Sequence, residues 1–316
     1  MSANSNFTEI ITTTLQGYSG VLADNVTNHN ALLRRLQSKG NITPATGRTI
    51  VQELEYAENA TTKWYSGYEV LDVGQSDVFS AAEFNWKQLN GNVVISGLEQ
   101  IQNSGKEAVH NLLKARIKNL EKSLSNTVAT AMYADGTGTS SKELGGLQHI
   151  IADDPTSTVG GISAATNTFW ANKEFDYGDN SLTADETNVQ AAMNSLWIDT
   201  IRGADHVDFI AGDKTYFTDY LESLQANQRF TNTEEANAGF MNLKYMTADV
   251  FYDDQCTANR LYFCNTDYLH LRPAADRQFV PLPEKAAVNQ DAIVVPMVWA
   301  GNMTCSNRSL QGLIQP

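Results

Sequence analysis

One apolar stripe stands out along the chain, because its members recur every three or four residues from residue 105 to residue 133. This spacing places them on one face of an α-helix; they are Val109, Leu113, Ile117, Leu120, Leu124, Val128 and Ala131. Ser104 is suited to cap the start of this helix, and Asp135-Gly136 is suited to end it. At 1.5 Å per residue the helix would be about 43 Å long, well beyond the usual length in globular proteins.

A second pattern is a concentration of aromatic and β-favouring side chains in residues 59–95. Its first run contains Trp64, Tyr65, Tyr68, Val70 and Leu71, and its second run contains Phe79, Phe84, Trp86, Leu89 and residues 93–95. Residues 72–76, with Gly74, are suited to a turn, so the pattern predicts two long antiparallel strands. An isolated two-stranded hairpin is marginal in water, and we therefore expect this one to be covered by another surface.

The other patterns are shorter. Residues 1–58 are interpreted as an arm with a helix near residues 30–38, and residues 136–185 as loops with short strands. A helix is predicted for residues 187–202.

A buried strand is predicted at residues 207–211, followed by a helix that Asp213 caps and that ends near residue 225. Residues 243–252 and 261–265 are predicted to pair as a hairpin around a polar turn. Further strands are expected at residues 268–271, 279–280 and 292–299, with Gly301 ending the last.

Charge narrows the class of protein. The 316 residues allow roughly one to three domains, and 36 acidic against 22 basic residues give a formal net charge of −14. This excess argues against a protein dedicated to binding nucleic acid, whose affinity comes mainly from Lys and Arg on phosphates. It does not exclude a surface that only surrounds nucleic acid, or an acidic surface that serves solubility alone.

Cysteine usage and the apolar runs predict a soluble protein that stays reduced. Cys256, Cys264 and Cys305 form no Cys-x-x-Cys motif, which predicts reduced thiols and assembly in a cytosol. The N-terminus lacks the basic and apolar regions of a signal peptide. The longest apolar run, residues 292–300, contains Pro296 and is too short for a membrane helix, which takes about 20 residues.

No motif for catalysis, cofactor binding or metal binding is complete, so the sequence predicts none of these sites. Residues 104–106 resemble the end of a phosphate-binding loop, but Gln100 replaces its first glycine and Glu107 follows the lysine. Asp205-His206-Val207-Asp208 has metal-ligating residue types, but adjacent side chains of a strand point apart, so a structural role is favoured. The carboxylate pairs are interpreted as solvated turn residues; they are Asp153-Asp154, Glu234-Glu235 and Asp253-Asp254.

The stretch from Gly239 to Leu271 carries a more particular pattern: Gly-Phe, a short strand, an acidic turn and then LYFCNTDYL. It resembles the closing sheet of the axial domain in tailed-bacteriophage major capsid proteins, which share the Hong Kong 97-type capsid fold. ELGGLQHII (residues 143–151) resembles the turn after that family's spine helix, and residues 207–230 resemble an axial-domain strand and helix. The order of the predicted elements also follows that family over essentially the whole chain.

The resemblance implies an α+β fold of the Hong Kong 97 type. Its parts would be an N-terminal arm, an extended β-hairpin loop, a peripheral domain with a long spine helix, and an axial α/β domain. On this sequence they correspond to residues 1–58 (arm), 59–95 (extended loop), 96–185 (peripheral domain, spine helix 105–133), 186–275 (axial domain) and 276–316 (returning peripheral strands).

The resemblance also implies a structural protein and no enzyme. Its copies would self-assemble into hexamers and pentamers of an icosahedral shell around double-stranded DNA. The implied partners are other copies of the chain, a portal protein and packaged DNA in non-specific contact, with no membrane. A separate scaffolding protein is expected because no long scaffolding segment precedes the arm, and a decoration protein stays an open alternative. The expected location is the virion, with assembly in the host cytoplasm.

The predicted subunit interface consists of the large aromatic side chains of the extended loop, because a bare hairpin cannot bury both faces; they are Trp64, Tyr65, Tyr68, Phe79, Phe84 and Trp86. The alternative is that they belong to the core of an ordinary sheet. Some capsid proteins join a loop lysine to an asparagine of a neighbouring subunit, but Lys63 and Lys87 do not lie near the predicted tip, so this reaction is not carried over.

Lys114, Lys118 and Lys122 recur on one face of the long helix. They are interpreted as a solvated face and not as a contact strip for a scaffolding protein or genome. Two alternatives to the capsid function stay open. An encapsulin-type nanocompartment shell protein would share the fold and enclose an enzyme. An α/β hydrolase-like enzyme with an unrecognised site belongs to another class, and His206 would be its first candidate residue.

Overall fold

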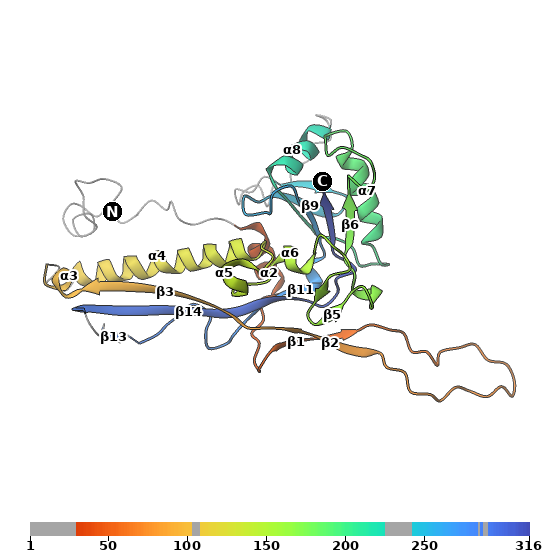
Figure 1. Ribbon diagram of the computed structural model, residues 1–316, viewed down its shortest axis with the longest axis horizontal. Coiled ribbons are helices and arrows are strands. Elements are labelled where there is room, and N and C mark those ends of the chain that lie inside the picture. Colours follow the sequence, from red (N-terminus) through yellow and green to blue (C-terminus); the bar gives the residue numbers. More distant parts are fainter. Residues whose placement is uncertain (1–29, 103–107, 225–241, 284, 287–289) are drawn as a thin grey trace.

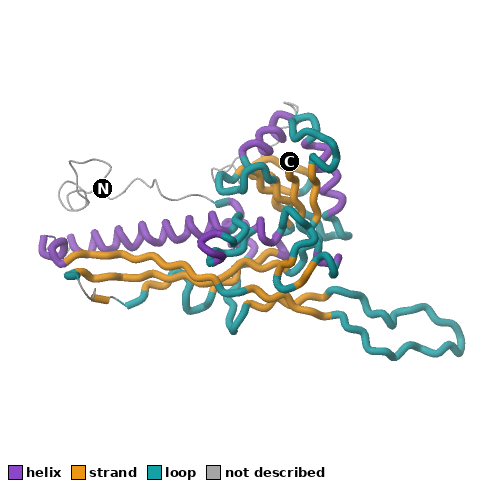
Figure 2. The backbone as a smooth tube through the Cα atoms, viewed as in Figure 1, coloured by secondary structure: helices purple, strands orange, loops and turns teal. Residues whose placement is uncertain are grey.

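The computed structural model describes residues 30–102, 108–224, 242–283, 285–286 and 290–316. Residues 1–29 of the predicted arm, Ser104 and Glu234-Glu235 lie outside the described residues. Figure 1 shows three parts: a long helix beside two long strands, a compact part that holds the C-terminus, and a hairpin that ends in a projecting loop. Figure 2 shows that this projecting end contains neither helix nor strand.

The long helix, α4 (Ala108–Ala131), lies along the strands β3 (Lys87–Ser96) and β14 (Ala292–Cys305), as Figure 1 shows. The predicted apolar stripe explains this packing. Ile117 and Leu120 contact a small cluster of Val93, Ile95 and Val295 between the helix and the two strands. The last turns of α4 enter the main core of the molecule. The long helix is therefore confirmed from residue 108 onward.

β14 is longer than the sequence predicted, because its first part pairs with β3 and its last part pairs with β11 (Leu269–Pro273). It pairs antiparallel with β3 up to Gly301, and from Gly301 onward it pairs with β11. Gly301 does not end the strand; a Cβ there would meet the carbonyl oxygen of Arg272 at 2.8 Å, so the glycine permits a close approach of β11. Three shorter elements border this sheet: α3 (Gly97–Gln102), β12 (Val280–Pro281) and β13 (Lys285–Ala286).

The compact part is a mixed six-stranded sheet in the order β6-β15-β10-β7-β9-β8. Its strands are β6 (Lys173–Asp176), β7 (Phe209–Gly212), β8 (Asn242–Tyr245), β9 (Ala248–Tyr252), β10 (Leu261–Cys264) and β15 (Gly312–Gln315). The helices α7 (Val189–Asp199) and α8 (Lys214–Ser223) bury their apolar side chains in one core with this sheet. A second core joins the sheet to α2 (Ala31–Lys39) and to the end of α4.

The hairpin predicted between residues 243–252 and 261–265 is wrong. β9 pairs with β8 on one side and in parallel with β7 on the other, and β7 separates β9 from β10. Every residue of β7 is buried, and a fully buried strand needs partners on both sides for its backbone groups. The strand predicted at residues 268–271 exists as β11, but it belongs to the sheet of β14.

Two predicted helix starts are confirmed by capping hydrogen bonds. α2 begins after Asn30, whose Oδ1 accepts a hydrogen bond from the amide of Leu33 at 2.7 Å. α8 begins after Asp213, whose Oδ1 accepts one from the amide of Tyr216 at 3.0 Å. Gly40 follows α2 with φ of +73°, the left-handed conformation that glycine adopts without strain.

The predicted aromatic hairpin is paired differently. β1 (Ile50–Glu55) pairs antiparallel with β2 (Phe79–Phe84), β3 pairs with β14, and residues 56–78 contain no strand. The prediction that residues 64–71 pair with residues 79–89 is wrong, because both halves of the second run find partners elsewhere in the chain. Beneath β1 and β2 lies a small core that includes Ile50, Leu54, Phe84 and Trp170.

Short elements connect these parts. Within residues 136–185 the predicted short strands include β4 (Thr158–Val159) and β5 (Ile162–Ser163), but the segment also contains short helices that were not predicted: α5 (Gly138–Ser141), α6 (Leu147–Ile150) and the 3-10 helix η1 (Thr168–Trp170). A second 3-10 helix, η3 (Thr266–Tyr268), joins β10 to β11. Among the helices in the described ranges, none combines the length and the hydropathy that a membrane span requires.

Candidate assembly surfaces

Residues 56–78, here called the projecting loop, carry large apolar side chains that no described part of the chain covers. Trp64 and Tyr68 are 101% and 107% exposed, as much as in an extended peptide. The other exposed apolar side chains of this loop are Tyr65, Val70, Leu71 and Val73. Soluble monomers rarely expose a contiguous apolar surface of this kind, so the loop has the character of a contact surface for another molecule.

The projecting loop is held by hydrogen bonds within itself. At its base the amide of Tyr56 donates to the carbonyl oxygen of Val78 at 3.0 Å, and the amide of Ala60 donates to Ser76 Oγ at 3.2 Å. These bonds lie at an exposed surface, where each contributes little net free energy. The loop can therefore bend at a small energetic cost.

The structure divides the six predicted interface residues. Trp64, Tyr65, Tyr68 and Phe79 are exposed, and Phe79 is 75% exposed at the start of β2. Phe84 is only 4% exposed and packs in the core beneath β1 and β2, so it is not available to a neighbouring molecule.

Trp86 is also held within its own chain, where its indole Nε1 donates to the carbonyl oxygen of Gly47 at 3.0 Å and its ring borders the same core. The sequence could not separate these two aromatic residues from the exposed ones, because their cover comes from residues 159–170. Val73 was missed because it lies in a segment that was interpreted as a turn.

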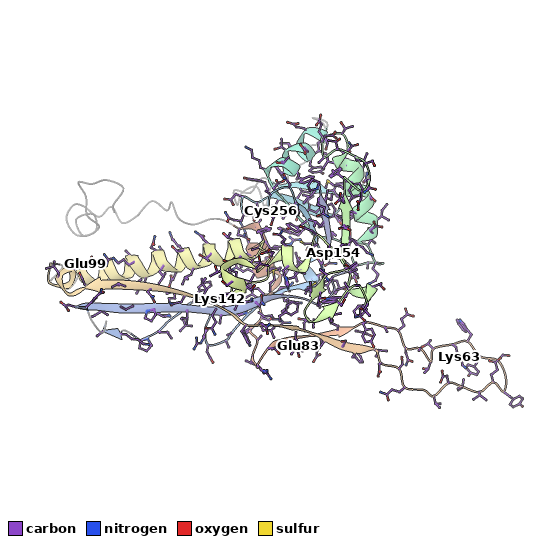
Figure 3. The ribbon with its side chains drawn as sticks, in the orientation of Figure 1. Lys63, Glu83, Glu99, Lys142, Asp154 and Cys256 are labelled. Carbon is purple, nitrogen blue, oxygen red and sulfur yellow. The ribbon has the colours of Figure 1, made fainter. Side chains whose placement is uncertain are left out.

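Of the two loop lysines, Lys63 lies farther out on the projecting loop than predicted. Figure 3 shows Lys63 on the outer part of the projecting loop, because the loop is centred near Gly67 and not on residues 72–76. Lys63 Nζ donates to the carbonyl oxygen of Val70 at 3.2 Å. Lys87 begins β3, and its Nζ donates to the carbonyl oxygen of Ser141.

A groove of about 480 Å³ lies between the C-terminal half of α4, the start of β3 and residues 139–144. Val128, Leu144 and Trp299 form its buried apolar floor, and Leu89 is half-buried at its side. Here called the spine groove, it combines segments that lie far apart in the sequence. No sequence pattern could have indicated it.

Charged side chains fasten α2 to the compact sheet. Lys39 Nζ lies 2.7 Å from Asp208 Oδ2 and 2.7 Å from Asp267 Oδ1, and Arg35 Nη2 lies 3.1 Å from Asp208 Oδ2. Burial acts to raise the pKa of Asp208, but hydrogen bonds from Lys39 and Thr266 outweigh it and lower this pKa. These ion pairs hold α2 against the compact sheet.

The side chains of Asp205, His206 and Asp208, which were considered for a metal site, face different partners. Asp205 accepts a hydrogen bond from Tyr268 Oη at 2.7 Å, one ring nitrogen of His206 lies 2.9 Å from the carbonyl oxygen of Ala204, and Asp208 faces α2. Across the ranges that the structure describes, no group of three His, Cys, Asp or Glu side chains is placed to hold a metal ion. The ring nitrogen of His206 that lies beside the carbonyl oxygen of Ala204 has a backbone partner, and not the carboxylate that commonly orients a histidine general base.

Asp253, which was predicted to be a solvated turn residue, is instead buried where β9, α2 and α4 meet. Its carboxylate accepts hydrogen bonds from Tyr133 Oη at 2.9 Å, from the amide of Ala31 at 3.3 Å and from the amide of Gln255 at 3.0 Å. Burial raises its pKa above the ordinary value, although these hydrogen bonds oppose the shift. The local sequence did not indicate this burial, because the segments that cover the carboxylate lie far from Asp253 in the sequence.

Cys256, Cys264 and Cys305 are free thiols buried in the main core. Burial raises the pKa of each thiol. A buried, protonated thiol is a poor nucleophile, so these residues serve packing.

Comparison with known proteins identifies the fold. No family model matches the chain, and no curated protein matches it in sequence. Its structure is similar to the capsid asymmetric unit of cyanophage A-1(L), with a TM-score of 0.72, 15% identity and 96% of each chain covered. It is similar to the capsid of an empty GTA particle, with a TM-score of 0.62, 13% identity and 99% of each chain covered.

A third similar structure is the SrpI encapsulin of Synechococcus elongatus, with a TM-score of 0.52, 6% identity, and coverage of 93% of this chain and 91% of that one. At these identities the likeness shows the fold. The chain has an α+β capsid fold, as the sequence resemblance predicted.

Proposed function

We propose that this chain is the major capsid protein of a tailed bacteriophage, and that its copies form hexamers and pentamers of an icosahedral shell around double-stranded DNA. The observation that carries the proposal is the exposed apolar surface of the projecting loop on a chain that is similar in structure to a phage capsid over 96% of its length. A subunit that is always surrounded by copies of itself can keep an exposed apolar surface, because its neighbours cover it. A free monomer with the same surface would aggregate. The role is structural and needs no catalytic site.

In this proposal the parts of the capsid fold follow the elements of the structure. The arm comprises the residues up to β1, and the extended loop is the β1–β2 hairpin with residues 56–78. α4, β3 and β14 form the peripheral domain, and the sheet with α7 and α8 forms the axial domain. These bounds replace the division expected for the extended loop, because β3 belongs to the sheet of β14.

The assembly would depend on many modest contacts acting together. Each projecting loop would lie on a neighbouring copy, and the closed shell would gain stability through multivalency. Bending of the loop would let one sequence fit both five-fold and six-fold surroundings. The net charge of −14 suits a container, because an acidic lining repels DNA phosphates and leaves only non-specific contact with the packaged genome.

The further partners and the location belong to the same proposal. The family resemblance supports a scaffolding protein that guides assembly, a portal protein at one vertex and, for some shells, a decoration protein. Assembly would take place in the host cytoplasm, and the mature protein would be part of the virion. The three free, buried thiols suit a reducing compartment.

The direct test is electron microscopy of the purified chain, expressed alone and together with its scaffolding protein. The expected result is closed shells of uniform size in negative stain. Chains that remain monomeric under both conditions, at every concentration that keeps them soluble, would overturn the proposal.

The second candidate is an encapsulin-type shell that encloses a protein cargo, which the likeness to the SrpI encapsulin favours. Purified shells distinguish the two. A phage capsid would protect double-stranded DNA from nuclease once its packaging partners are present. An encapsulin would instead copurify with one cargo enzyme, identified by mass spectrometry, and contain no protected DNA.

A further inference from the structure

The spine groove has room for an aromatic side chain together with the residues beside it. Its volume of about 480 Å³ falls within the range of about 300–1,000 Å³ that is usual for pockets that bury a drug-sized ligand. Trp299, Val128 and Leu144 provide an apolar floor, and the exposed threonines Thr127 and Thr130 of α4 stand at its edge. An aromatic ring with one polar end fits such a floor and edge.

One rim of the spine groove is built from an unusual backbone. Thr139, Ser140 and Ser141 all have positive φ, at 48°, 59° and 62°, a conformation that residues other than glycine rarely adopt. The amino group of Lys87 donates to the carbonyl oxygen of Ser141 and so supports this turn. Strained backbone of this kind is concentrated at binding surfaces.

The projecting loop of the same chain cannot fill this groove. Figure 3 shows Lys142, on the rim of the groove, close to the middle of the long sheet, whereas Lys63 lies far out on the loop. The β1–β2 hairpin points the loop away from α4 and α5 (Figure 1). An aromatic side chain from a projecting loop can therefore enter the groove only from a second copy of the chain.

The charges of the two surfaces are complementary. The projecting loop contains four acidic residues and one basic residue, Lys63, for a net charge of −3. The rim of the spine groove carries Lys87 and Lys142 against Glu143 alone, for a net charge of +1. Opposite charges on facing surfaces favour encounter and set the orientation of a complex.

We propose that the spine groove receives the projecting loop of a second copy, with the ring of Tyr68 over Trp299 and the carboxylate of Glu69 facing Lys142. Tyr68 has the greatest fractional exposure of the exposed large apolar residues and is next to an acidic residue, which matches a floor beside a lysine. The inference rests on the proposed self-assembly, since it needs a second copy. It adds the identity of the receiving site.

Photo-cross-linking in assembled particles tests the proposal. Thr127→p-benzoylphenylalanine places the reactive group at the edge of the spine groove, and Glu121→p-benzoylphenylalanine, on an exposed position of α4 outside the groove, is the matched control. Particles are assembled from a mixture of ordinary and ¹⁵N-labelled chains, irradiated and digested with trypsin. Because residues 64–86 contain no lysine or arginine, the loop is released as one peptide, Trp64 to Lys87.

The expected result is a cross-link from residue 127 to the peptide Trp64–Lys87 that joins a light chain to a heavy one, and its absence from the control. A cross-link to the peptide of residues 1–34 would mean that the N-terminal segment occupies the groove and would overturn the inference. Particles without any cross-link from residue 127 would overturn it too, while leaving the capsid function intact. If neither the parent chain nor the control variant forms particles, both the proposed function and this inference fail. If only the residue-127 variant forms none, the charge-reversal cycle below decides the inference.

A charge-reversal cycle gives an independent measurement. Lys142→Glu or Glu69→Lys alone should raise the protein concentration needed for assembly about fivefold, and the two together should restore the parent value. Lys118→Glu, on the exposed face of α4, is the control and should not be rescued by Glu69→Lys. A double variant that assembles no better than either single variant would show that Glu69 does not face Lys142.

Discussion

Replacing Tyr68 with alanine should separate assembly from folding, because this side chain is fully exposed in the free subunit. Exposed substitutions usually change the free energy of unfolding by about 0.5 kcal/mol or less. In the shell, by contrast, burial of the ring would remove roughly 150–250 Å² of aromatic surface from water. Its loss should cost about 2 kcal/mol per contact, a change of roughly thirtyfold in each association constant. Repeated around a shell, this loss should abolish closed particles at concentrations where the parent protein assembles.

Phe84 provides the matched control, since it is an aromatic residue of the same hairpin but is only 4% exposed. It packs against the core that contains Ile50 and Trp170. Phe84→Ala should lower the free energy of unfolding by about 3–5 kcal/mol, because it leaves a cavity. Tyr68→Ala should therefore impair assembly and leave the free energy of unfolding nearly unchanged, whereas Phe84→Ala should lower the free energy of unfolding.

The two quantities are measured separately. Urea denaturation of the unassembled chain, followed by tryptophan fluorescence, gives the free energy of unfolding, and negative-stain microscopy counts the particles. Particles of Tyr68→Ala at the parent's assembly concentration would refute the reasoning. So would a denaturation midpoint for Tyr68→Ala that falls as far as that of Phe84→Ala.

Three further predictions concern groups inside the subunit, and urea denaturation over a series of pH values measures them. The pKa of Asp253 is raised in the folded chain, so its contribution to the free energy of unfolding declines as the pH rises from the ordinary aspartate value through the raised one; Asp253→Asn should remove this slope. The pKa of Asp208 is lowered, so its stabilisation is present above the ordinary value and is lost as the pH falls through the lowered one. Asp208→Asn should cost about 2 kcal/mol at neutral pH by weakening the contact with Lys39, and a loss that persists at acidic pH would contradict this cause. Gly146→Ala should cost about 3 kcal/mol, because the added Cβ would overlap backbone carbonyls at the end of α4, and an unchanged denaturation midpoint would contradict it.

The helices show how much a local pattern can predict. The stripe from Ile117 to Val128, the helix near residues 30–38 and the cap at Asp213 were all legible in the sequence, and the structure contains the corresponding helices. A helix makes its hydrogen bonds between residues four apart, so its limits depend on neighbours in the chain. The order of these elements also carried the resemblance to a capsid fold.

The strands show where local patterns fail. β7 separates β9 from β10, and β3 pairs with β14 although about 200 residues lie between them in the sequence. A strand-forming pattern states that a segment is extended, but it does not name the partner, because ladder hydrogen bonds join residues that can be anywhere in the chain. Both hairpins predicted from adjacent runs were therefore wrong.

The assembly surfaces depend on both levels. The sequence alone determined that a short segment contains an excess of aromatic residues that a thin hairpin cannot bury. Only the tertiary structure decided that Tyr68 is exposed while Phe84 is buried, and it alone formed the spine groove from α4, β3 and the turn before Leu144. The physical reason is that exposure is a property of what packs around a side chain, and those neighbours are brought together by the fold and not by the order of the residues.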